Sequence, residues 1–292
     1  MTLTEPRPTD DSPPNPATAP PRPRGGSGWV LPGCVALLVA HPNQTTYNVS
    51  LRERAVAASL RERHPRLAEA MRGAADLEEA AVRRAVQHHD QVLHIGFGIG
   101  VPGREPHQWW QRPYGRCPSV AAVTTCRHAL AWTHQHCEAR ATTLYEPEKS
   151  LHRTLYNHYL PTDFDRPVGV VLAAHRTPRR ATDELLKQLL RRLAPGSTLA
   201  LIGLAVDDRG ERHRLREQWA RRTSQRPCLL HDKRPAGLLH RLHHLDPLPD
   251  ALAAHLPPGR REPAPGPGIR AFGTVYRIGH LPPSTTRSGS AA

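Results

Sequence analysis

A glycine-rich turn is the feature of this sequence whose residue types and spacing could bind a ligand. The apolar run 92–95 leads directly into Gly96, Gly98 and Gly100, spaced as Gly-x-Gly-x-Gly. Glycine lets the chain turn sharply and lets the backbone approach a ligand, because no Cβ stands in the way. A strand that ends in such a turn is typical of nucleoside-binding α/β proteins. It is equally typical of an ordinary connection between a strand and a loop.

The end of the next apolar run is the second candidate ligand position. Proteins that bind nucleosides on this kind of sheet commonly place an acid there, where it holds the ribose hydroxyls. This sequence has Thr124, Thr125 and Cys126 instead. A threonine hydroxyl can hydrogen-bond a ribose, but without the added strength of a charged acceptor.

Short apolar runs alternate with helical segments through the middle of the chain, and these elements must position the glycine turn. The runs predict strands over 92–96, 120–124, 142–145, 168–174, 198–206 and 273–278. Helical segments are predicted between them over 127–138, 148–157, 181–193 and 209–221. This alternation predicts a mostly parallel sheet with helices on both faces. The last strand follows a proline-rich loop, so we expect it to return antiparallel at or near the sheet edge.

The distribution of proline and apolar residues divides the chain into four parts. Residues 1–28 are rich in proline and poor in large apolar residues, which predicts a disordered tail. Residues 29–88 are expected to form a helical or capping region. Residues 89–280 hold the alternating strands and helices and form the main domain, and 281–292 are a second polar tail.

Within the N-terminal region, the apolar run 29–40 is too short to span a bilayer, so no membrane association is expected. We interpret it as a buried strand or a capping segment. A helical pattern begins near residue 50 and is interrupted by Pro65. Asp76 is a suitable N-cap, so it is predicted to begin a further helix that ends near Val86.

The formal net charge of the whole chain is +14, which favours an acidic partner. The densest basic segment runs from Arg209 to Arg226 and contains seven arginines. Leu215 and Trp219, four residues apart, would anchor it as a helix with a basic outer face. That face could dock an acidic partner, or it could be an ordinary solvated surface. Nucleic acid is the less favoured partner.

Cysteine and histidine usage limits the location and the chemistry. The five cysteines are an odd number, no Cys-x-x-Cys pair occurs, and this pattern fits a reducing cytoplasm rather than a disulfide framework. Residues 126–137 contain three histidines and two cysteines, but their spacing matches no zinc motif. We therefore expect no metal site.

Four segments carry a resemblance to a known family. They are 80–86 (AAVRRAV), 92–98 (VLHIGFG), 163–172 (DFDRPVGVVL) and 194–199 (APGSTL). Together they resemble the actinobacterial S-adenosyl methyltransferase family, whose members are similar to class I methyltransferases. The resemblance extends over about 41–278. It implies a Rossmann-like class I methyltransferase fold.

The resemblance also implies a cofactor and an activity. S-adenosylmethionine would bind at the glycine turn and at the ends of the second and third strands. The implied binding residues are His94, Gly96, Gly98, Gly100, Thr124, Thr125 and Glu146. The methyl group would go to an unknown acceptor, and no catalytic side chain is assigned because methyl transfer depends mainly on proximity and orientation. Trp109 and Trp110 could stack on the adenine, line a substrate entrance or plug the site.

Two departures from the family pattern bear on that activity. The family's aspartate before the glycine turn is His94 here, and its acidic second-strand end is Thr124-Thr125-Cys126. Each lost charge-assisted hydrogen bond is worth roughly 1.5–3 kcal/mol, so two losses would weaken binding by about a hundredfold or more. Two hypotheses follow: a methyltransferase with a degenerate cofactor site, or a non-catalytic binding or regulatory protein on the same fold. A nucleic-acid-binding protein is the third alternative.

Overall fold

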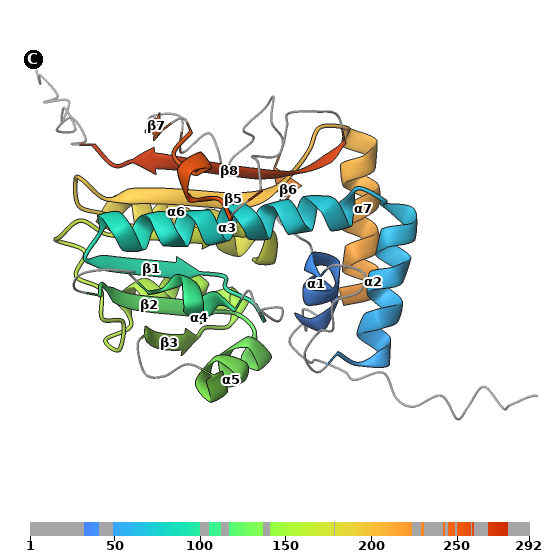
Figure 1. Cartoon of the computed structure of the whole chain (residues 1–292), viewed down its shortest axis with the longest axis horizontal. Helices are drawn as coiled ribbons and strands as arrows, with labels where there is room; N and C mark the ends of the chain where they lie inside the picture. The colour runs from blue at the N-terminus through green and yellow to red at the C-terminus, as the bar shows by residue number, and fades with distance from the viewer. Residues whose placement is uncertain are drawn as a thin grey trace, which may run out of the picture.

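The structure is a computed structural model, and Figure 1 shows the arrangement of its elements. The described residues are 32–40, 49–99, 105–111, 117–136, 141–177, 179–223, 229–230, 242, 245–248, 250–257, 259 and 268–279. The predicted tails 1–28 and 281–292 lie outside these residues, as does Gly100.

One sheet forms the centre of the molecule, with strand order β3-β2-β1-β4-β5-β8-β7 and β6 paired with β5. Its strands are β1 (Gln91–Ile95), β2 (Ser119–Thr124), β3 (Ala141–Tyr145), β4 (Gly169–Ala173), β5 (Thr198–Val206), β6 (Leu229–Leu230), β7 (Asp246–Leu248) and β8 (Ile269–Arg277). β1 to β5 run parallel to one another. The prediction of a mostly parallel sheet is therefore confirmed.

The last long strand, β8, pairs antiparallel with β5 along its whole length, from Thr198 opposite Arg277 to Val206 opposite Ile269. The short strand β7 pairs antiparallel with its other side. This confirms an antiparallel late strand near the sheet edge. The strand begins at Ile269, earlier than the sequence pattern indicated.

Helices cover both faces of the sheet (Figure 1). They are α1 (Pro32–Val39), α2 (Leu51–Arg63), α3 (Leu67–His88), α4 (Pro106–Trp109), α5 (Arg127–His136), α6 (Arg179–Arg192) and α7 (Arg209–Thr223), with 3-10 turns η2 (Glu148–Tyr156), η3 (Ala174–Arg176) and η5 (Ala253–His255). α3 lies along one face and α6 along the other. Successive side chains of a strand point to opposite faces, so each parallel strand supplies both layers of the core.

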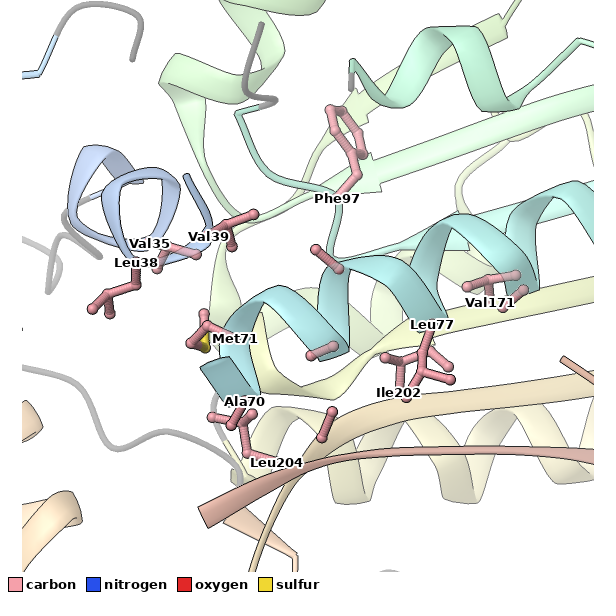
Figure 2. Close-up of a cluster of buried hydrophobic side chains, with 14 of the residues drawn as sticks. Val35, Leu38, Val39, Ala70, Met71, Leu77, Phe97, Val171, Ile202 and Leu204 are labelled. Atoms are coloured by element: carbon pink, nitrogen blue, oxygen red, sulfur yellow. The ribbon is translucent and has the colours of Figure 1, made fainter. Parts of the chain in front are cut away.

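Two buried clusters correspond to these two faces. The cluster on the α3 side includes Val92, Val171 and Ile202 together with Met71 and Leu77 of α3. Figure 2 shows Met71, Leu77, Val171 and Ile202 of this cluster, with α1 contributing from the carboxyl end of the sheet. The cluster on the α6 side joins strand residues such as Leu93 and Leu172 to Leu185, Leu186 and Leu189. The α3 layer is the one that reaches the glycine turn.

The described part of the N-terminal region is helical, but the predicted helix start at Asp76 is wrong. Asp76 does not begin a helix, because α3 runs uninterrupted from Leu67 to His88 and Asp76 is buried in its middle. Of the two alternatives for the run 29–40, the strand is wrong because the described part forms α1, and the capping segment stays a prediction. A short, uniformly apolar run has no periodicity to separate a buried strand from a buried helix.

The entry into α2 has a complete capping box, a local signal that the sequence carries in full. The Ser50 hydroxyl accepts from the Glu53 N–H at 3.3 Å, and the Glu53 carboxylate accepts from the Ser50 N–H at 2.8 Å. This reciprocal pairing satisfies two donors that a helix N-terminus otherwise leaves without partners. α2 then packs on α3, α1 and α7.

Within the described residues, none of the helices has both the length and the apolar character needed to cross a bilayer.

Candidate functional site

The glycine turn follows β1, the strand at which the order of successive strands in the sheet reverses. From β1 the chain proceeds to β2 on one side, while β4 pairs with β1 on the other. In open α/β sheets, ligands bind outside the carboxyl ends of the strands at such a switch point. The region outside the carboxyl ends of β1, β2 and β4 is therefore the candidate site, and we call it the switch-point crevice.

Gly96 is required by its backbone and by its neighbour. It has a φ of +87°, a conformation that residues with a Cβ rarely adopt. A Cβ at this position would lie 2.9 Å from the carbonyl oxygen of Ala173 on β4. The Gly96 N–H donates to the Val123 carbonyl of β2 at 2.8 Å. Gly96 thus closes the turn tightly between β2 and β4.

Gly98 makes room for a side chain of the protein itself. A Cβ on Gly98 would collide with Nη1 of Arg176 and would lie 2.9 Å from its Cζ. Arg176 is the last residue of η3, the turn that follows β4. Its guanidinium therefore occupies the space directly above the turn. The absence of a side chain at Gly98, which the sequence pattern attributes to a ligand, is used here by Arg176.

Thr124 ties the glycine turn to β2. Its hydroxyl donates to the Phe97 carbonyl at 2.8 Å and accepts from the Cys126 N–H at 3.1 Å. The residue is 1% exposed, so these bonds are shielded from water. Thr125 is half-buried beside it. In this arrangement the Thr124 hydroxyl holds the chain together, in place of the ribose contact implied by the sequence.

Glu146 follows β3, one strand further along the same edge. Its N–H donates to the Thr124 carbonyl at 3.0 Å. Its carboxylate accepts from the Asn157 side chain at 3.4 Å, and the residue is half-buried. Glu146 therefore lies at the carboxyl edge of the sheet, with its carboxylate directed to the segment after η2.

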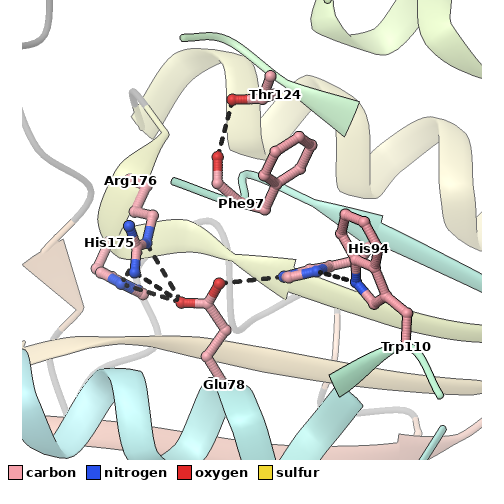
Figure 3. A network of polar contacts seen from close by, with 7 residues as sticks. All are labelled: Glu78, His94, Phe97, Trp110, Thr124, His175 and Arg176. Atoms are coloured by element: carbon pink, nitrogen blue, oxygen red, sulfur yellow. Dashed lines mark hydrogen bonds and ion pairs between the residues drawn. The ribbon is translucent and has the colours of Figure 1, made fainter. Parts of the chain in front are cut away.

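His94 is fully buried on β1 and belongs to a chain of polar contacts (Figure 3). The Trp110 indole N–H donates to His94 Nδ1 at 3.2 Å, and His94 Nε2 lies 3.1 Å from Glu78 Oε1. An indole N–H can only donate, so Nδ1 must be the acceptor and Nε2 must carry the proton. The network thus assigns His94 as the neutral tautomer that donates to Glu78.

Glu78 reaches this point from α3 and is 0% exposed. Its Oε2 accepts from Arg176 Nε at 3.2 Å, and Arg176 Nη2 lies at 3.2 Å from the same oxygen. Burial alone would raise the pKa of Glu78, but the Arg176 charge and the His94 hydrogen bond outweigh it and lower the pKa to about 2. A buried carboxylate at the switch point is therefore ionised at neutral pH.

His175 completes the cluster without adding a charge. Arg176 Nε donates to His175 Nε2 at 3.1 Å, and this ring nitrogen lies 3.6 Å from Glu78 Oε2. Burial, and then the Arg176 charge, lower the pKa of His175 to about 4. Among the described residues, Arg176 is thus the only permanent cation in an ion pair with Glu78.

Aromatic side chains pack against one another beside the glycine turn. Trp110 follows α4 and is 3% exposed. Its ring lies edge-on to Phe97, with 5.7 Å between centroids, and edge-on to His94 at 6.3 Å. Such edge-to-face contacts are favourable arrangements of aromatic rings. The sequence left three roles for Trp109 and Trp110: stacking on an adenine, lining an entrance or plugging the site. The burial of Trp110 against Phe97 and His94 favours the plug.

Two solved structures share this architecture over most of the chain, whereas no protein-family model and no curated protein matches it. A candidate methyltransferase from Thermobifida fusca superimposes with a TM-score of 0.64, covering 87% of this chain and 96% of its own, at 16% identity. A DUF574 family protein from Streptomyces avermitilis gives a TM-score of 0.63, covering 84% and 96%, at 18% identity. The chain has a Rossmann-like methyltransferase fold. At these identities the similarity establishes the fold.

On this methyltransferase fold, three residues of the crevice were missed by sequence reasoning: Glu78, His175 and Arg176. A signal for Glu78 is present in the helical spacing. It lies four residues after Ala74 and four before Val82, both buried, so it is an acid on the apolar side of α3. The signal for Arg176 is absent from local sequence, because its partners lie on α3 and in the turn after β1.

The basic segment from Arg209 is a helix up to Thr223, and Arg226 lies outside the described residues. Leu215 and Trp219 are buried and anchor it, as predicted. The histidine-rich segment forms α5, where His134 contacts the Thr143 hydroxyl at 2.7 Å. Over the part of the chain that the structure describes, no group of three or more His, Cys, Asp or Glu residues could hold a metal ion.

An open cavity of about 490 Å³ lies at the opposite, amino end of β1 and β2. Asp90, Gln91, Ser119 and Asp163 are among the residues that line it. The Gln91 side chain exchanges two hydrogen bonds with the Asp163 backbone, at 2.7 and 3.1 Å. These bonds give Gln91 a structural role, joining β1 to the segment that leads into β4.

Proposed function

We propose that this chain is an S-adenosylmethionine-dependent methyltransferase with an unidentified acceptor, and that its cofactor site is the switch-point crevice. The observation that carries the proposal is the Gly96–Gly98 turn, which follows β1 and abuts β4 on a methyltransferase fold. When bound, the cofactor would supply an electrophilic methyl group. Positioning of the acceptor would be the main task of the protein, so no catalytic side chain is assigned.

The side chains as arranged do not fit the cofactor. The guanidinium of Arg176 stands above Gly98, and Phe97 and Trp110 pack against each other beside the turn. The Thr124 hydroxyl is committed to the Phe97 carbonyl, and no carboxylate follows β2. The backbone of the turn has no Cβ at Gly98, and the space there is taken only by the Arg176 side chain. Binding therefore requires the Arg176 side chain to turn away from Gly98.

Isothermal titration with S-adenosylmethionine and S-adenosylhomocysteine tests this proposal. We expect saturable micromolar binding that Gly98→Trp abolishes. Gly279→Trp is the matched control, because a side chain at Gly279 would meet nothing within 4 Å. Absence of heat from a folded sample at high ligand concentration would overturn the enzyme proposal.

The filled crevice supports one alternative, a non-catalytic binding protein on the same fold. The exposed residues of α7 include Arg209, Arg214 and Arg221, and an acidic partner is the chemistry that would complement them. Binding to such a partner should weaken steeply with added salt.

The exposed free thiol of Cys117 supports a reducing location such as the cytoplasm.

A further inference from the structure

The Glu78 carboxylate is a fixed negative charge at the base of the switch-point crevice. Both of its oxygens are engaged, Oε1 by His94 at 3.1 Å and Oε2 by Arg176 at 3.2 Å. With the side chain 0% exposed, water does not screen the charge. A buried carboxylate without a counter-ion is strongly destabilising or takes up a proton, so the ionised form of Glu78 needs a cation beside it.

The fold holds the two side chains of this pair, Glu78 and Arg176, to different degrees. Glu78 is fixed by α3, whose helical turns on either side are packed into the core. Arg176 reaches the carboxylate with a long, flexible side chain from the end of η3, and it is 11% exposed. Of the two side chains in the pair, only Arg176 has surface in contact with solvent.

The guanidinium occupies ligand space, as its relation to Gly98 shows. It lies where the Cβ of any other residue at position 98 would stand. That space is at the carboxyl ends of β1 and β4, where this class of sheet receives ligands. Arg176 thus combines two properties of a bound ligand: it fills the glycine-lined space and it neutralises the buried charge.

We propose that the switch-point crevice is a binding site for an organic cation, with Arg176 as its resident occupant. A ligand enters when a cationic group of its own replaces the guanidinium on Glu78. The inference deepens the proposed function and rests on it only for the identity of the ligand. For S-adenosylmethionine and S-adenosylhomocysteine, the cationic group would be the ammonium of the amino-acid end.

Chemical rescue of Arg176→Ala in the full chain tests the cation site without the cofactor. The variant should unfold about 10 °C below the wild type, because Glu78 loses its counter-ion. Methylguanidinium at about 10 mM should raise the melting temperature of the variant by roughly 4 °C if it binds near 1 mM. The wild type should show no such rise, since its site is occupied.

Three controls separate rescue from a general salt effect. Urea, which has a similar shape and no charge, should not rescue Arg176→Ala. Methylguanidinium should not rescue Arg83→Ala, which removes an exposed arginine paired at 2.8 Å with the adjacent Glu79. The double variant Glu78→Gln/Arg176→Ala should lose the response. An equal response to urea, or a response kept by the double variant, would overturn the proposal.

Glu78→Gln provides a second test that does not require Arg176→Ala to fold. It keeps the shape of the side chain and removes the charge. We expect S-adenosylhomocysteine to lose at least tenfold in affinity, while 5′-methylthioadenosine, which lacks the ammonium, changes little. If methylguanidinium rescues Arg176→Ala but the cofactor does not bind, the cation site is supported and the methyltransferase proposal is overturned. If the cofactor binds wild type and Glu78→Gln equally well and methylguanidinium does not rescue, the cation site is overturned and the methyltransferase proposal is supported.

Discussion

Two adjacent residues of α3, Glu78 and Glu79, each pair with an arginine, and their surroundings give the two pairs different consequences. Glu78 faces the sheet, and Arg176 reaches it from 98 residues away in the sequence. Glu79 pairs with Arg83 one helical turn along, and the Arg83 side chain is 49% exposed. Glu78 is fully buried and Arg176 nearly so, whereas in the second pair Glu79 is buried and water reaches only the arginine. The distance in sequence between a carboxylate and its arginine therefore does not indicate how much the pair contributes to stability.

The largest expected difference is between Arg176→Ala and Arg83→Ala. Removing Arg176 leaves a buried charge without its partner, which costs about 3–5 kcal/mol. The free energy of unfolding should fall by that amount in urea titrations, with an unchanged denaturant slope. If the two variants lose the same free energy of unfolding, Glu78 is solvated and the two pairs do not differ.

Acid should destabilise the protein through the buried cluster around Glu78. His175 has a folded pKa lowered from 6.5 to about 4, so the unfolded chain binds the extra proton first and stability falls as pH drops from 6.5 to 4. The loss is on the order of 3 kcal/mol. Glu78, with its folded pKa lowered from 4.5 to about 2, adds a further loss below pH 4.5.

Urea unfolding of His175→Gln between pH 4 and pH 7 measures this contribution. The variant should show a flatter pH dependence above pH 4.5 than the wild type. His134→Gln is the control, because His134 is exposed and contacts only a surface threonine among its described hydrogen bonds. If both variants keep the slope of the wild type, His175 is not the group that titrates.

A smaller effect is expected at the aromatic end of the network. Trp110→Phe keeps a ring against Phe97 but removes the indole N–H that donates to His94. A buried ring nitrogen left without its donor costs about 1–3 kcal/mol. Thermal unfolding should detect the loss, and Trp109→Phe, at an equally buried neighbour, controls for the change in ring size.

The smallest effect is expected at the pair of Arg83 and Glu79, of which only the arginine is exposed. Arg83→Ala should lower the free energy of unfolding by about 0.5–1 kcal/mol, since water screens the Arg83 charge. The effect should shrink in 1 M salt. A large loss would indicate that Arg83 does more than pair with Glu79.

The fold was largely predictable because its signals are local. The parallel strands are uniformly apolar runs, the capping box at Ser50 and Glu53 begins α2, and Gly96 needs a positive φ whatever the ligand. The wrong helix start at Asp76 and the wrong strand alternative for the run 29–40 arose where local patterns were ambiguous. An acid inside a helix resembles a cap, and a short apolar run suits either a strand or a helix.

The sequence by itself determined the order of the strands and helices, the position of the glycine turn and the lack of an acid after β2. Those features depend on residue types within a few positions of one another. Only the tertiary structure decided what fills the turn, because Glu78, His94, Trp110 and Arg176 come from four separate segments and meet only when α3 lies across the sheet. Burial then turns an ordinary glutamate and arginine into a charge pair that water no longer screens.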